Sequence, residues 1–91
     1  MFKLMIVEDE PEIRQHIKSM IDWENLNLEL VVECGDSDVV MENAAIFQPQ
    51  IVIMDICLPG KDGLCLSKEL KQWNPNVKII IVSSFPNQSY S

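Results

Sequence analysis

Acidic side chains directly follow two of the most apolar segments of this 91-residue chain: Glu8 and Asp9 follow one, and Asp55 follows the other. A hydroxyl residue, Ser83, follows a third apolar segment. Carboxylates that lie close together repel one another unless a proton or a cation intervenes. Carboxylate and hydroxyl oxygens are hard ligands, and no histidine or cysteine cluster accompanies them. The expected ion is therefore Mg²⁺. A carboxylate beside Mg²⁺ and a hydroxyl can accept a phosphoryl group, since the metal and the donors neutralise the developing charge.

Apolar runs alternate with amphipathic segments along the chain, in the order β-α-β-α-β-α-β. The runs at 3–7, 51–54 and 77–82 are nearly continuous, as in strands buried on both faces, and 28–34 predicts another strand. This alternation predicts an α/β domain with a doubly wound parallel sheet. Right-handed crossovers place every strand's carboxyl end on one edge of the sheet. If the first strand is central, the three carboxylates therefore converge at that edge.

Helical spacing of apolar residues predicts which side chains of each helix face the sheet. The first helix begins at Pro11, which suits a first turn, and Pro49 ends the second. The expected inward-facing residues are Ile13, Ile17, Met20 and Ile21 in the first helix, Val40, Ala44 and Phe47 in the second, and Leu66, Leu70 and Trp73 in the third.

Composition excludes several classes of function. Fourteen acidic and seven basic residues give a net charge of −7, which repels nucleic-acid backbones. The apolar runs are far shorter than the roughly 20 residues that cross a bilayer, and the N-terminus does not resemble a signal peptide. Three cysteines and one histidine, without a CxxC pair, favour buried thiols in a reducing cytoplasm over disulfides or a zinc site.

The acidic residues also have a purely structural interpretation. Glu10, Glu12 and Asp62 stand where acids commonly complement a helix dipole or form a turn. Glu8, Asp9 and Asp55 fit that interpretation less well, because all three follow apolar strands in the order that a shared site requires.

Short motifs at these same positions resemble the receiver domain of two-component response regulators. The motifs are VEDEP at 7–11, IVIMD at 51–55, LPGKDG at 58–63 and IIVSS at 80–84. The segments at 21–24 and 28–35 are similar to receivers that precede AraC-type helix-turn-helix output domains. The resemblance implies a CheY-like sheet of strand order 2-1-3-4 within a single receiver domain, residues 1–91. It also implies a signalling switch and not an enzyme.

The resemblance implies a role for each matching residue. Asp55 would accept a phosphoryl group from the phosphohistidine of a sensor histidine kinase. Asp9 and Glu8 would hold Mg²⁺, with Glu8 acting through water. The backbone carbonyl of Cys57 would be a further metal ligand, and the Ser83 hydroxyl would contact the phosphoryl group.

The sequence departs from the family pattern at its C-terminal end, where strand five, its lysine and helix five are missing. We therefore expect an incomplete receiver, with an AraC-type DNA-binding domain absent from this chain. The run at 77–82 would then be a sheet edge on which two chains could pair as a homodimer. A second hypothesis follows from this departure: a protein-interaction module that acts without phosphorylation.

A third hypothesis is a small-molecule enzyme or flavin carrier, since the same fold supports many functions. Against an acid-based phosphatase, Cys57 stands where a second aspartate would follow Asp55. Against flavin binding, the acids after the first strand would repel a phosphate.

Overall fold

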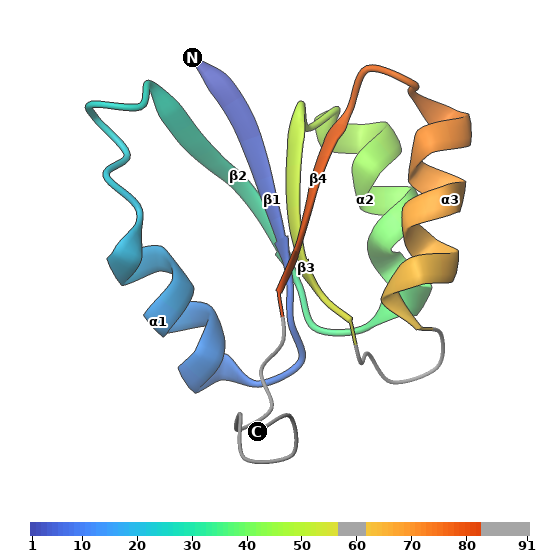
Figure 1. The fold of residues 1–91 in the computed structure, drawn as a ribbon, viewed down its shortest axis with the longest axis horizontal. Helices are drawn as coiled ribbons and strands as arrows, with labels where there is room; N and C mark the ends of the chain where they lie inside the picture. Colours follow the sequence, from blue (N-terminus) through green and yellow to red (C-terminus); the bar gives the residue numbers. More distant parts are fainter. Residues whose placement is uncertain (57–61, 83–91) are drawn as a thin grey trace, which may run out of the picture.

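The computed structural model describes residues 1–56 and 62–82, which form an α/β domain (Figure 1). The predicted alternation of strands and helices is confirmed, with a short 3₁₀ turn added before the second helix. The elements in chain order are β1 (Phe2–Val7), α1 (Pro11–Met20), β2 (Leu28–Cys34), η1 (Ser37–Val39), α2 (Val40–Phe47), β3 (Ile51–Asp55), α3 (Gly63–Trp73) and β4 (Lys78–Val82).

The four strands form one parallel sheet in the order β2-β1-β3-β4, as predicted. Val7, the last residue of β1, pairs with Cys34 of β2 and with Met54 of β3. Asp55 at the end of β3 pairs with Val82 at the end of β4. The carboxyl ends of all four strands therefore meet at one edge of the sheet.

Helices cover both faces of the sheet, with α1 on one side and α2 and α3 on the other (Figure 1). Successive residues of β1 point to opposite faces, as a strand requires. Met5 and Val7 join the buried cluster that includes Leu66 and Leu70 of α3. Leu4 and Ile6 join a second cluster, with Ile17 of α1. This alternation explains why β1 is apolar throughout.

Two predicted inward-facing residues are exposed. Met20 is 65% exposed and Phe47 is 37% exposed, although Ile17, Val40 and Ala44 on the same helices are buried. Each exposed residue is the last of its helix. At the end of α1, the side chains of Ile21 and Trp23 pack against the second cluster instead. The Trp23 indole also donates a hydrogen bond of 3.0 Å to the Lys18 carbonyl.

Strand β4 forms an edge of the sheet within residues 1–56 and 62–82, where it pairs with β3 alone. Ile80 is 49% exposed and Ile81 is 37% exposed. The predicted apolar edge is therefore present in this part of the chain. None of the helices in the described ranges is both long and apolar enough to cross a membrane.

Candidate functional site

Parallel strand pairing positions the acidic residues. Glu8 directly follows β1, and its N–H donates a hydrogen bond of 2.9 Å to the Cys34 carbonyl at the end of β2. Asp55 is the last residue of the neighbouring strand β3, whose Met54 pairs with Val7. The adjacent ends of β1 and β3 therefore carry the two carboxylates side by side.

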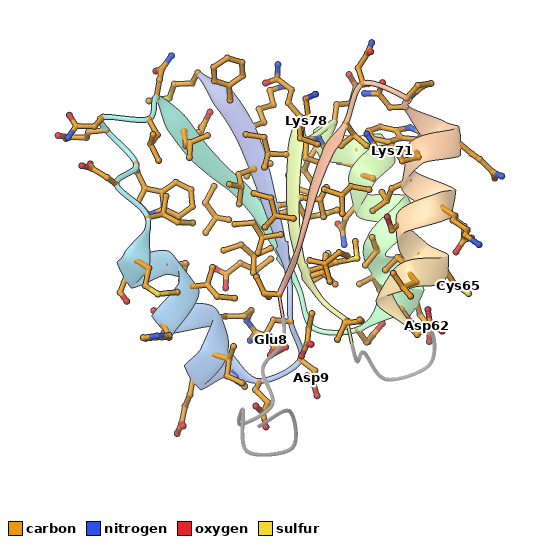
Figure 2. The ribbon with its side chains drawn as sticks, viewed as in Figure 1. Glu8, Asp9, Asp62, Cys65, Lys71 and Lys78 are labelled. Atoms are coloured by element: carbon orange, nitrogen blue, oxygen red, sulfur yellow. The ribbon has the colours of Figure 1, made fainter. Side chains whose placement is uncertain are left out.

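Glu8, Asp9 and Asp55 form one acidic cluster, and one carboxylate oxygen from each lies within 4.8 Å of the others. Glu8 and Asp55 are buried, whereas Asp9 is exposed. Figure 2 shows Glu8 and Asp9 together at the carboxyl edge of the sheet. The predicted convergence of these three side chains is present, with one of them open to solvent.

Burial and the neighbouring carboxylates raise the pKa of Glu8. Among the described residues, neither of its carboxylate oxygens receives a hydrogen bond from a donor group. Desolvation, a side-chain hydrogen bond with Asp55 and the nearby negative charges together raise the pKa of Glu8 to about 8. When Glu8 is protonated, its own proton can form that hydrogen bond with Asp55, because two ionised carboxylates have no proton to share. In the metal-free protein, Glu8 therefore retains its proton to a higher pH than an ordinary glutamate does.

A divalent cation fits this cluster. The ligands are all carboxylate oxygens, which are the ligands that Mg²⁺ prefers. The buried Glu8 carboxylate lacks a donor among the described residues, and a cation would supply the missing positive charge. Exposed Asp9 leaves one side open to water, which Mg²⁺ usually retains in its coordination shell. The residues therefore suit a hydrated Mg²⁺ ion.

Other acidic residues nearby have structural positions. Asp62 caps α3, and its Oδ1 accepts a hydrogen bond of 2.8 Å from the Cys65 N–H. Glu10 precedes α1, and Glu12 lies in the first turn of that helix. These positions agree with the structural interpretation of the three residues. Two predicted site residues, Cys57 and Ser83, lie outside the described residues.

Two residues at the site were missed from the sequence. Arg14 of α1 donates a hydrogen bond of 2.6 Å to the Glu8 carbonyl. Gly63 begins α3, and its N–H donates a hydrogen bond of 2.8 Å to the carbonyl of Ile56, the residue after Asp55. The acceptor for Arg14 is a backbone carbonyl, which no residue type marks, so the sequence held no signal for this contact. Gly63 belongs to the LPGKDG motif at 58–63, and nothing in that motif indicates a contact with the end of β3.

Comparisons with known proteins agree with this fold. The family model described as "Response regulator receiver domain" matches residues 4–91. The chain is 33% identical over 91 residues to the uncharacterized transcriptional regulatory protein YesN of Bacillus subtilis, covering 100% of this chain and 25% of YesN. The chain therefore spans about a quarter of the length of that relative.

Solved structures show the same architecture. The REC domain of AraT, a response regulator from Geobacillus stearothermophilus, matches with a TM-score of 0.85 and 32% identity, over 98% of this chain and 69% of that chain. A two component transcriptional regulator AraC from Clostridium phytofermentans matches with the same TM-score at 22% identity, over 100% of this chain and 73% of that chain, which shows the shared fold. The expected resemblance to receivers of AraC-type regulators is confirmed.

A receiver is a regulatory signalling domain and not a classical enzyme. The strand order, the acidic cluster at the carboxyl edge and the match over residues 4–91 lead to one conclusion. The chain belongs to the response regulator receiver domain family.

Proposed function

We propose that this chain is a phosphoacceptor receiver of a two-component system, in which Asp55 takes a phosphoryl group from a sensor histidine kinase in a Mg²⁺-dependent reaction. The observation that carries the proposal is the acidic cluster itself. Asp55 is 1% exposed at the end of β3. One of its carboxylate oxygens lies within 4.8 Å of a carboxylate oxygen of Glu8 and of Asp9. Family membership supports the same function.

Each carboxylate has a distinct part in the proposed reaction. Asp55 would attack the phosphorus of a phosphohistidine, forming a P–O bond while the P–N bond breaks and the imidazole leaves. Asp9 and Glu8 would hold the cation together with Asp55, and the resemblance adds the Cys57 carbonyl to these ligands. Bound Mg²⁺ would neutralise charge on the phosphoryl oxygens. By the same resemblance, the Ser83 hydroxyl would contact the phosphoryl group.

The partners follow from the family. The donor would be a histidine kinase, and the output would be transcription through an AraC-type DNA-binding domain. Support comes from the relatives, since YesN is named a transcriptional regulatory protein and this chain covers 25% of its length. We propose a cytoplasmic location because Cys34 and Cys65 are free thiols, which a reducing compartment maintains.

A phosphorylation assay tests this function. The protein is incubated with acetyl phosphate and Mg²⁺, and its intact mass is measured. We expect the mass of one added phosphoryl group in the wild type and none in Asp55→Asn or without Mg²⁺. Asp62→Asn is the matched control, because Asp62 is an exposed helix cap, and it should be labelled like the wild type. Failure to label the wild type, or labelling of Asp55→Asn, would contradict the proposal.

The exposed β4 edge favours a second candidate function, association of two chains as an interaction module. In an antiparallel pair centred on Ile80, Ile79 of one chain would lie opposite Ile81 of the other. The side chains of these opposite residues would then point to the same face of the combined sheet. Such edges readily recruit another strand. Sedimentation should show that the wild type is a dimer and that Ile80→Lys is a monomer. Ile46→Lys is the control and should remain a dimer, because Ile46 is exposed on α2 and not on the β4 edge. A wild-type monomer at high concentration would exclude this function.

A further inference from the structure

Both backbone polar groups of Glu8 are bonded to other elements. Its N–H donates to the Cys34 carbonyl at the end of β2, over 2.9 Å. Its carbonyl accepts from Nη1 of Arg14, on α1, over 2.6 Å. The carbonyl belongs to the planar peptide unit that joins Glu8 to Asp9. Arg14 therefore holds the unit whose rotation would swing the Asp9 side chain away from Glu8.

Arg14 is itself held in place from β2. Its Nε lies 3.3 Å from Oε1 of Glu33, and the Arg14 side chain is only 20% exposed. The other oxygen of Glu33 accepts a hydrogen bond of 3.0 Å from Lys18. The Arg14 guanidinium can contact the Glu8 carbonyl and the Glu33 carboxylate at once, because its N–H groups form a rigid fork. The Arg14 side chain thus connects α1, β2 and the turn after β1.

We propose that Arg14 is a positioning residue for the metal site: by holding the Glu8 carbonyl, it fixes Asp9 toward Glu8 and Asp55 in the geometry that binds Mg²⁺. This inference rests on the proposed function, since it assigns a role at the same site. Arg14 would touch neither the ion nor the phosphoryl group. Groups that orient metal ligands in this way commonly affect metal affinity strongly when they are removed.

The direction in which Mg²⁺ affinity changes when Arg14 is replaced distinguishes a positioning role from a purely electrostatic one. Loss of a positive side chain near a cation site strengthens cation binding if charge alone acts, because a repulsion disappears. Loss of a positioning residue weakens cation binding. Lys18 provides the matched control, since it is also a cation of α1 that pairs with Glu33, but its ammonium is bonded to that glutamate and not to the Glu8 carbonyl.

The test is a calorimetric Mg²⁺ titration of four full-chain proteins: the wild type, Arg14→Gln, Arg14→Lys and Lys18→Gln. We expect the dissociation constant of Arg14→Gln to rise about tenfold. Arg14→Lys keeps the charge but not the fork, so its affinity should lie between those of Arg14→Gln and the wild type. Lys18→Gln should bind Mg²⁺ as well as the wild type or slightly better.

Metal-free thermal unfolding serves as the second measurement. Lys18→Gln loses one partly exposed ion pair, whereas Arg14→Gln loses an ion pair and the hydrogen bond to the Glu8 carbonyl. The unfolding midpoint of Arg14→Gln should therefore be slightly the lower, and both variants should stay folded at the temperature of the titration. Equal or tighter Mg²⁺ binding by Arg14→Gln would overturn the inference while leaving the proposed function intact. An equal loss of Mg²⁺ affinity in Lys18→Gln would also overturn it, because the loss would then not depend on the hydrogen bond to the Glu8 carbonyl. A wild type that binds no Mg²⁺ would overturn both the inference and the proposed function.

Discussion

Gly63 lies directly against the backbone of Asp55, at the start of α3. A Cβ atom at position 63 would stand 2.7 Å from the Asp55 carbonyl oxygen and 2.9 Å from the Cα of Ile56. Both neighbours are backbone atoms, which cannot swing aside as the end of a flexible side chain can. Because Gly63 is also bonded through its N–H to the Ile56 carbonyl, α3 is fixed to the end of the strand that carries the proposed phosphoacceptor.

Gly63→Ala should therefore destabilise the protein and disturb Asp55. Alanine favours helices over glycine by up to about 1 kcal/mol, but forcing a methyl group into packed backbone costs about 1–3 kcal/mol, so the steric effect wins. Urea unfolding should show a lower free energy of unfolding, and labelling by acetyl phosphate should slow. Ser67→Ala, in the middle of the same helix, is the control, and its stability should stay close to that of the wild type. A Gly63→Ala protein more stable than the wild type would contradict the close approach.

Stability of the metal-free protein should depend on pH through Glu8. The pKa of Glu8 is about 8 in the folded protein, against an ordinary value of 4.5, so the folded state holds an extra proton between these values. The stability contributed by this group is therefore greatest below about pH 4.5 and declines as the pH rises toward 8. Urea unfolding in a chelator should show wild-type stability falling by a few kcal/mol relative to Glu8→Gln over this range.

Glu8→Gln serves as the internal reference because its side chain has no charge to titrate. Carboxylates distant from Glu8 affect both proteins alike, so the difference between the two curves reports Glu8 together with the carboxylates coupled to it. Saturating Mg²⁺ should flatten the difference, since a bound cation favours the ionised carboxylate. Parallel curves without metal would show that Glu8 titrates normally.

Gln48 offers a stabilising substitution far from the site in sequence. It directly follows α2 as the C-cap residue with φ 51° and ψ 57°, a left-handed conformation that costs a non-glycine residue energy. Gln48→Gly should raise the free energy of unfolding by about 0.5–1 kcal/mol, because glycine adopts this conformation readily. Gln72→Gly, in the last turn of α3, should instead lower it by up to about 1 kcal/mol. Thermal unfolding of both variants checks this prediction. A loss of stability in Gln48→Gly as well as in Gln72→Gly would contradict the left-handed conformation of Gln48.

Much of the fold could be predicted from local patterns. The continuous apolar runs identified the strands of a sheet buried on both faces, and the acids that follow them located the functional edge. Periodicity failed at Met20 and Phe47 because a stripe of apolar residues does not reveal where a helix passes beyond the cluster that it covers. Both residues end their helices and are exposed.

The supports of the site were beyond sequence reasoning for physical reasons. Arg14 acts on a backbone carbonyl, and no residue type in the sequence marks that acceptor. The need for glycine at position 63 comes from its approach to Asp55, which depends on how α3 returns to the sheet. The difference between buried Glu8 and exposed Asp9 also required the packed structure.

The proposed function depends on Glu8, Asp9 and Asp55 binding one divalent cation together. Paramagnetic Mn²⁺, titrated in place of Mg²⁺, broadens the NMR signals of nuclei close to the bound ion. We expect the amide signals of Glu8, Asp9, Asp55 and Ile56 to broaden first. Excess Mg²⁺ should restore them, and Asp9→Asn should weaken the effect. Broadening that begins on other acidic surfaces, or that Asp9→Asn leaves unchanged, would contradict the proposed function.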